Sequence, residues 1–352
     1  MIRVPGRVRR RIERLLLRIS AKSPLLSSLY YGLFSDAFRR EHFAVARGRI
    51  RYLEASASPE GSTYLLRRNI HRLEKGLLMR PRRPVFATKY IEETVDCYER
   101  VVRHRLACSN GGDLPGAEEI AWAHDVLATY FSVVDSHPTV DRAADAFRRI
   151  PPLRRGTDIQ LVPYKRDVEQ TPPVRYEDLA ALARRRRSVR WYLQKPVPRE
   201  MIDRAIEVAA QAPSACNRQP FRFLVFDDPE LVRKVASVPL GTAGFYDNLP
   251  VIVVLVGELR SFFSERDRHA VYIDASLAAM SFVLALESQG LSSCCINWPD
   301  IEPQESIMAE LLRLAPDERV IMLIGLGFPD PDGLVAYSQK RSLDELREYN
   351  RR

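Results

Sequence analysis

Arg186-Arg187-Ser188-Val189-Arg190, which runs on into Trp191-Tyr192, is one of two stretches that decide the fold of this 352-residue chain. The other is Ala212-Pro213-Ser214-Ala215-Cys216-Asn217-Arg218-Gln219-Pro220-Phe221. The first gathers guanidinium groups, whose fork of donors matches phosphate oxygens, around a serine hydroxyl. The second gathers small and amide side chains, and amides suit the edge of a heteroaromatic ring because they both donate and accept. Taken alone, each stretch is equally compatible with a solvated helix face or a polar loop.

The residues around these stretches alternate between helical and strand-like patterns. Helices are expected at 176–187, 200–211 and 270–289, the last of them ended by Gly290. Strands are expected at 221–226, 251–256, 292–296 and 320–325, and the run 251–256 is rich in β-branched residues. Helices between buried strands imply a sheet that is covered on both faces.

The length suggests two domains. Residues 1–150 are predicted to form a mainly helical domain, with a loop at 110–116. Residues 151–175 contain Pro151, Pro152, Pro163, Pro172 and Pro173 and are predicted to be a linker. Residues 176–352 are then the second domain.

The two stretches, in this order and with Pro196-Val197-Pro198 and a helix between them, resemble the opening of the nitroreductase family. The tail resembles it too, through Gly290-Leu291-Ser292-Ser293-Cys294-Cys295-Ile296, Ile324–Pro329 and Lys340–Glu345. The resemblance covers residues 176–352. It implies an α+β fold with a central, mostly antiparallel sheet flanked by helices. It also implies a homodimeric oxidoreductase with FMN at the subunit interface. NADH or NADPH would deliver a hydride, and a small-molecule acceptor would then take it in ping-pong order.

The resemblance also assigns cofactor-binding residues. It implies that the FMN phosphate and ribityl chain are held by Arg186, Arg187, Ser188 and Arg190. It implies flavin contacts, often from the partner subunit, for Pro213, Ser214, Ala215, Asn217 and Gln219. It places Ile296 and Asn297 near the ring, and Lys340 and Arg341 near the phosphate. No side chain stands out as a general acid. The sequence departs from the family at Ala215, at Phe221 and in the lysine-free loop 239–248, which leaves nicotinamide and substrate preference open.

The net charge of +9 belongs to residues 1–50, which hold 12 basic and 3 acidic residues. From Arg9 to Ile19, apolar residues recur at helical spacing among arginines, as in a basic amphipathic helix. This helix either packs on its own domain or, with residues 1–34, contacts an anionic membrane surface. Nucleic acid is disfavoured because no aromatic residue precedes Tyr30.

No signal peptide is predicted, because Arg18 interrupts the short apolar run 15–17. No transmembrane helix is predicted, because no stretch of about 18 apolar residues lacks a charge. The expected location is the cytoplasm, with peripheral contact at the inner face of the membrane as an open alternative.

His71 and Glu74 lie one helical turn apart in the segment Arg67–Leu77. A di-iron bundle needs two such His and Glu sets, so no metal is predicted. The simplest interpretation is a helix that ends at Gly76, and the alternative is a substrate-facing or domain-docking role. Similar His-x-x-Glu-Lys-Gly segments precede some nitroreductase domains associated with bacterial surface-polysaccharide synthesis.

Five cysteines, odd in number and without a CxxC, indicate reduced thiols and argue against a zinc ribbon. Cys294 and Cys295 are expected on opposite faces of a buried strand, and Cys216 is expected to be a packing residue. Two other functions stay open. One is a flavin-dependent oxidase or dehydrogenase acting on a polysaccharide-pathway or peptide intermediate, and the other is a non-catalytic flavin-binding scaffold.

Overall fold

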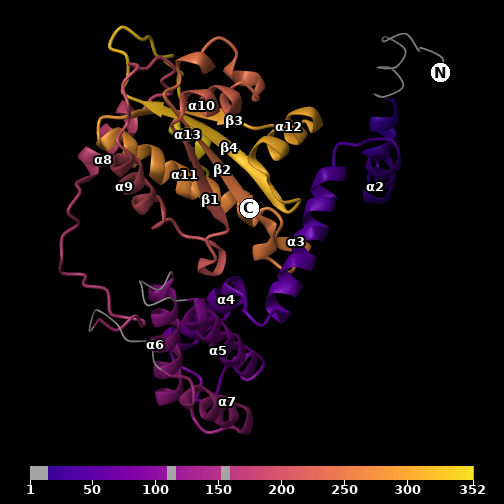
Figure 1. Ribbon diagram of the computed structural model, residues 1–352, viewed down its shortest axis with the longest axis vertical. Coiled ribbons are helices and arrows are strands. Elements are labelled where there is room, and N and C mark those ends of the chain that lie inside the picture. Colours follow the sequence, from indigo (N-terminus) through magenta and orange to yellow (C-terminus); the bar gives the residue numbers. More distant parts are fainter. Residues whose placement is uncertain (1–14, 109–115, 152–158, 352) are drawn as a thin grey trace.

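The computed structural model describes residues 15–108, 116–151 and 159–351. Figure 1 shows a body built around a sheet, a separate bundle of helices, and a long helix that runs from one to the other. Four antiparallel strands form the sheet in the order β1 (Phe221–Phe226), β2 (Val251–Glu258), β4 (Glu318–Gly327) and β3 (Ser292–Asn297). All four strands lie where the sequence predicted them, and the predicted antiparallel fold is confirmed.

Strand β2 is buried along its whole length because helices cover both faces of the sheet. Val251, Val253 and Leu255 share a core with α9 (Arg199–Ala209) and α11 (Ala270–Ser288). The alternate residues of β2 share a second core with α10 (Pro229–Ala236) and α12 (Glu302–Leu312). Successive side chains of a strand point to opposite faces, so a strand between two apolar layers must be apolar at every position.

Another hydrophobic core holds the bundle together. Its helices are α4 (Thr63–Leu78), α5 (Ile91–Cys108), α6 (Ala117–Val133) and α7 (Pro138–Arg148). Tyr98 and Tyr130 are its largest fully buried side chains. Each hydroxyl has a partner, since that of Tyr130 donates to the Phe86 carbonyl at 2.7 Å and that of Tyr98 lies 3.1 Å from Nδ1 of His124. The bundle therefore buries these tyrosines without leaving their hydroxyls unpaired.

Helix α4 does not end at Gly76, where the sequence pattern predicted its end, but continues to Leu78. Gly76 is required for another reason. A Cβ built there would lie 2.2 Å from Cε2 of Phe86, so the aromatic ring occupies the space of a side chain. The loop after α4 thus folds back directly onto the helix.

Helix α3 (Arg39–Ala57) packs on the sheet-containing body, although it precedes the bundle in the chain (Figure 1). Ala44 is fully buried in the same core as β2. A Cβ on Gly48 would lie 2.8 Å from the Leu259 Cβ and 2.9 Å from the Leu259 carbonyl carbon, in the short helix η4 (Leu259–Ser261). Nη1 of Arg51 lies 2.9 Å from the buried carboxylate of Asp317. One face of α3 is therefore fitted to a surface formed more than 200 residues later.

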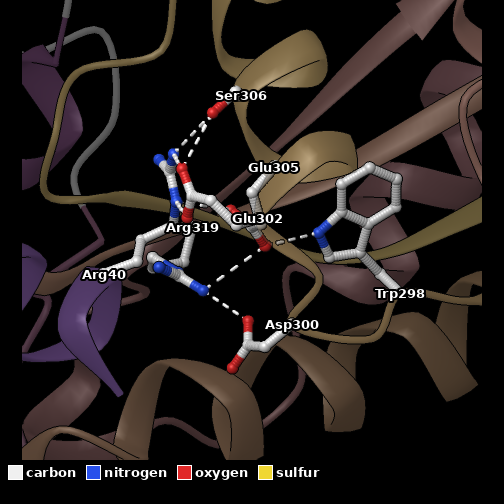
Figure 2. A network of polar contacts seen from close by, with 7 residues as sticks. All are labelled: Arg40, Trp298, Asp300, Glu302, Glu305, Ser306 and Arg319. Carbon is white, nitrogen blue, oxygen red and sulfur yellow. Dashed lines mark hydrogen bonds and ion pairs between the residues drawn. The ribbon is translucent and has the colours of Figure 1, made fainter. Parts of the chain in front are cut away.

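Figure 2 shows a polar network at the start of this contact. Nε of Arg40 donates to Glu302 at 2.8 Å, and Glu302 also accepts from the hydroxyl of Ser306 at 2.8 Å. Behind them, Glu305 accepts from Nε1 of Trp298 at 2.7 Å and pairs with Arg319 at 3.3 Å. The network joins α3 to α12 and β4.

Acid is expected to loosen the contact between α3 and α12. The hydrogen bond from Arg40 lowers the pKa of Glu302 to about 2, so the folded protein binds fewer protons here than the unfolded chain. The contribution of the pair is complete above about pH 4.5 and is lost as the pH falls from there toward 2. Because Glu302 is exposed, the pair contributes at most about 1 kcal/mol to stability.

Cleavage of the segment before α3 by an acid-active protease, measured across this pH range, checks this expectation. The control is Glu302→Gln, which removes the titrating group. The neighbouring Glu305, whose pKa is raised by burial, is present in both proteins. The difference between their two pH profiles therefore isolates Glu302. Identical profiles would contradict the assignment.

Helix α2 (Pro24–Leu33) buries none of its residues. Leu25, Leu29, Leu33 and Phe34 are all exposed. The apolar residues that follow the predicted amphipathic helix are therefore not packed on the domain. Residues 15–20 are helical, and the rest of the predicted helix from Arg9 to Ile19 lies outside the described residues.

The connection between the bundle and the sheet-containing body carries no helix or strand over 159–175, where the sequence predicted a linker. Most of the predicted loop at 110–116 and part of the Pro-rich segment lie outside the described residues. The remaining helices are α8 (Tyr176–Arg185) and α13 (Leu343–Leu346). In the described part of the chain, Glu265–Ser288 is the one stretch long and apolar enough to cross a membrane. Half of its most apolar 18 residues are buried, because it contains the core helix α11.

Candidate functional site

An open cavity of about 450 Å³ lies where residues 183–190 meet the C-terminal segment. Of the described residues, five basic side chains and no acidic one line it: Arg184, Arg186, Arg187, Arg190 and Lys340. The other lining residues are Ala183, Ser188, Ala336, Tyr337, Ser338 and Gln339. Guanidinium and ammonium groups, together with the hydroxyls of Ser188, Tyr337 and Ser338, form a donor set for a phosphate.

The Arg-rich motif is fixed to the edge strand β3. Helix α8 ends at Arg185, and the extended chain after it places the Val189 N–H 3.1 Å from the Ser293 carbonyl. The buried hydroxyl of Tyr192 donates to the carbonyls of Val189 (2.6 Å) and Gly325 (3.2 Å). Burial raises the pKa of Tyr192, so it stays a donor. The motif thus has one defined position beside the sheet.

The C-terminal segment closes the other side of the cavity. Asp330 N–H donates to the Trp191 carbonyl at 3.1 Å, and Nη2 of Arg187 donates to the Ala336 carbonyl at 2.7 Å. These contacts bring Lys340 to the cavity. Arg341, the other member of the predicted pair, turns away, and its Nη2 donates to the Glu345 carbonyl at 2.9 Å. The sequence analysis did not assign Arg184 and residues 336–339 to the site, although they line the cavity. For residues 336–339, the position just before Lys340 was the available signal.

The cavity fits the phosphate end of FMN. Nε of Arg186 is buried and has no hydrogen-bond partner among the described residues. Arg186 and Arg190 both line the cavity, so their cations face the same space. An anion with several oxygens would supply hydrogen-bond acceptors to these cations.

The second motif forms a strained loop around the short helix η1 (Ala215–Asn217). Cys216, Asn217 and Gln219 have φ values of 56°, 51° and 49°, in the left-handed region that residues other than glycine rarely adopt. Asp274 of α11 accepts from the Ala215 N–H at 2.9 Å, and Ser214 Oγ accepts from the Gln219 N–H at 3.1 Å. Strain of this kind clusters at ligand sites, where the surrounding contacts maintain it.

The two motifs lie far apart within one chain. The loop 213–219 leads into β1 at one edge of the sheet, and Ser188 pairs with Ser293 of β3 at the other edge. Three strand spacings separate these edges, about 14 Å. The register also places the two motifs at opposite ends of the sheet. Phe221, which follows the loop, pairs with Gly257 near the end of β2. Ser293 lies level with Val251 at the start of β2, because both residues pair with the same residue of β4. Neither Pro213 nor any residue of the loop lines the Arg-rich cavity.

The remaining predicted residues lie on β3. Ile296 is buried and Asn297 is exposed, and neither lines the cavity. Cys294 is buried and Cys295 is exposed, so the two thiols do face opposite ways. The prediction of a buried strand is correct for four of its six residues, and β3 is an edge strand that exposes Cys295 and Asn297. All five cysteines are free.

His71 and Glu74 belong to the packing of the bundle. Glu74 accepts from Nε1 of Trp122 at 3.0 Å and lies 3.4 Å from Nδ1 of His71. Across the described ranges, no three His, Cys, Asp or Glu side chains gather in an arrangement that could hold a metal ion. Helix α4 also contacts the strained loop, since Nη1 of Arg67 donates to the Asn217 carbonyl at 3.4 Å.

Comparison with known proteins agrees with this geometry. Residues 183–243 and 235–328 match the model of the Nitroreductase family. Iodotyrosine deiodinase 1 of Rattus norvegicus is 24% identical over 214 residues, covering 53% of this chain and 74% of that protein. An NADH dehydrogenase of Thermus thermophilus is 29% identical over 197 residues, covering 47% of this chain and 93% of that protein.

Among solved structures, an FMN-dependent nitroreductase from Clostridium difficile R20291 is 24% identical, with a TM-score of 0.42, and covers 49% of this chain and 99% of that one. The matched residues contain the Arg-rich motif, the strained loop and the whole sheet. The family uses FMN with NAD(P)H as the electron donor, so the predicted class, an FMN-dependent oxidoreductase, is confirmed. Over residues 183–328, this chain matches the nitroreductase family.

Proposed function

We propose that the protein passes a hydride from NADH or NADPH to a small-molecule acceptor in ping-pong order, with FMN held in the Arg-rich cavity. The observation that carries this proposal is the cavity itself, where five cations converge and the buried Nε of Arg186 has no hydrogen-bond partner in the part of the chain that the structure describes. Bound FMN supplies hydride acceptance and donation. The chain supplies binding, orientation and an open face for two substrates in turn.

Each motif has its own part in holding FMN. Arg186, Arg187, Arg190 and Lys340 neutralise the phosphate, and Ser188 adds a hydroxyl donor. Pro213, Ser214, Ala215, Asn217 and Gln219 position the ring, and their strained backbone, held by Asp274, fixes the direction of its amide groups. Ile296 and Asn297 of β3 border the flavin ring. Arg341 is the chain neighbour of Lys340 in the C-terminal segment.

The active form is a homodimer. One FMN can contact both motifs only if they come from different copies, because they lie at opposite edges and ends of the sheet in one copy. Helix α11 also presents exposed apolar side chains one turn apart, at Ile273, Leu277 and Met280. A second copy that covers this stripe would bury it and bring its own loop to the cavity.

The protein acts in the cytoplasm, with peripheral contact at the inner face of the membrane through residues 1–34. Two features support this contact. Residues 1–22 hold eight basic residues and one acidic residue, and the adjoining α2 exposes its leucines and Phe34. Anionic headgroups would attract the basic segment, and the apolar side chains would enter the interface.

The visible spectrum of the purified protein, recorded before and after anaerobic addition of NADH or NADPH, tests the proposed function. Flavin bands that bleach on addition are the expected result. Bands that persist would favour a flavin-dependent oxidase or dehydrogenase acting on a polysaccharide-pathway or peptide intermediate, or a non-catalytic flavin scaffold. No flavin, even after incubation with FMN, would exclude all three.

The acceptor is left open for a chemical reason. The relatives are named for different reactions, an iodotyrosine deiodination and an NADH dehydrogenation. Activity on nitroaromatics would not identify the acceptor either, because an exposed reduced flavin passes electrons to many compounds.

A further inference from the structure

A second basic cavity lies in the bundle, away from the Arg-rich cavity. Its volume is about 460 Å³, within the range of small-ligand sites. It lies between the end of α4 and the loop that follows, and is called the α4 pocket below. Its lining is Arg72, Gly76, Met79, Arg80, Pro81, Arg83, Phe86, Ala87 and Tyr90.

Three of the lining residues are arginines without a carboxylate partner among the described residues. Arg72 donates to the amide oxygen of Asn69 at 3.2 Å and stacks on the Tyr90 ring, 3.6 Å from its centroid. Arg80 and Arg83 are exposed. The contrast is Arg67 on the same helix, which is paired with Glu119 at 2.9 Å.

The charge of the whole segment is one-sided. Residues 67–90 contain eight basic residues and one acidic residue, Glu74. Glu74 is already engaged by Trp122 and His71. Three cations that converge without counter-charges repel one another, and a bound anion would relieve this repulsion.

The pocket is also held in shape. The loop is tied to α6 and its C-terminal end, because the Phe86 carbonyl accepts from the hydroxyl of Tyr130 at 2.7 Å and the Pro84 carbonyl accepts from the Asp135 N–H at 2.9 Å. The ring of Phe86 fills the space beside Gly76. Arg80 and Arg83 therefore extend from an anchored loop rather than from a free tail.

We infer that the α4 pocket binds a small phosphorylated organic molecule, best matched by a diphosphate ester. Three guanidinium groups suit at least two negative charges and can bind phosphate oxygens in pairs. Met79, Pro81 and Phe86 give the pocket an apolar wall for the organic part. The α4 pocket shares no lining residue with the Arg-rich cavity, so it is a separate site.

The pocket also has a physical connection to the strained loop. Arg67 contacts Asn217, and Gly76 follows nine residues later on the same helix, a rise of about 13 Å. Arg68 and Arg72 lie between these two positions on the helix, four residues apart and so on the same side of it. A molecule held by its phosphates in the pocket therefore has a row of cations leading toward the loop.

Calorimetric titration of the full-length protein with uridine diphosphate tests the inference, with uridine as the uncharged comparison. Wild-type protein is expected to bind the diphosphate and not uridine. Arg72→Gln and Arg83→Gln are each expected to weaken binding by about tenfold or more. The matched control is Arg82→Gln, which removes the same charge from the same loop but does not line the pocket.

Three results would overturn the inference: no binding to the wild-type protein, equal binding of uridine, or an equal loss in Arg82→Gln. The last would mean that binding follows net charge alone. The variant Arg186→Ala/Arg190→Ala is expected to keep its affinity for uridine diphosphate. A parallel loss there would place the ligand in the Arg-rich cavity instead.

Discussion

FMN is expected to be almost absent from the purified variant Arg186→Ala/Arg190→Ala. Both side chains line the Arg-rich cavity, and the buried Nε of Arg186 finds no hydrogen-bond partner within residues 15–108, 116–151 and 159–351. A hydrogen bond to a charged group contributes about 1.5–3 kcal/mol, so losing two costs about 3–6 kcal/mol. The dissociation constant for FMN should rise by about a hundredfold to ten-thousandfold. Flavin content from absorbance, and titration of the apoprotein with FMN, measure the change.

The control for this variant is Arg185→Ala/Arg199→Ala, which removes the same charge from the same body. Arg185 pairs with Glu287 at 3.0 Å and Arg199 with Asp227 at 2.7 Å, so neither serves the cavity. This control should retain FMN, and both variants should show the same circular dichroism as the wild type. Full FMN content in Arg186→Ala/Arg190→Ala would mean that the phosphate binds elsewhere.

Replacing Gly48 with valine is expected to separate α3 from the sheet-containing body. The new side chain would meet the Leu259 Cβ at 2.8 Å and the Leu259 carbonyl carbon at 2.9 Å. Since backbone atoms cannot rotate away, the helix itself has to move. Overpacking of this kind costs about 3 kcal/mol and should lower the melting temperature by roughly 5–10 °C. Calorimetry measures the shift, and limited proteolysis between α2 and α3 should become faster.

Gly32 on α2 provides the matched control, because a Cβ there would have no atom of a described residue within 4 Å. Gly32→Val should leave the melting temperature within about 1 °C of the wild type, since exposed substitutions are usually nearly neutral. If both variants behaved alike, helix propensity rather than the contact with Leu259 would explain the result.

The strands and the main helices could be predicted because their signals are local. The run 251–256 has to be apolar at every position to lie between two layers, and such a run is visible in the sequence. Gly290 has a positive φ of 81° and ends α11 where the pattern predicted. Gly76 wrongly predicted a helix end. A glycine is needed there because the ring of Phe86 occupies the space of a side chain, and not because the backbone needs a positive φ.

Parts of the site could not be predicted because they depend on contacts between distant segments. Lys340 and Arg341 are indistinguishable in the sequence, and the hydrogen bond from Arg187 to Ala336 is what turns Lys340 toward the cavity. The docking of α3 depends on Leu259 and Asp317, which leave no pattern in residues 39–57. The distance between the two motifs follows from strand order, which the sequence does not contain.

The docking face of α3 has a consequence for synthesis on the ribosome. Arg51 and its partner Asp317 are 266 positions apart. At roughly 5–20 residues per second, translation needs about 10 to 50 seconds to connect them. Residues 63–150 can assemble during this interval because their core is their own. Ala44 and Gly48, in contrast, stay exposed to solvent until the later residues are made, as do the nearby leucines of α2. We expect a chaperone to bind this nascent segment.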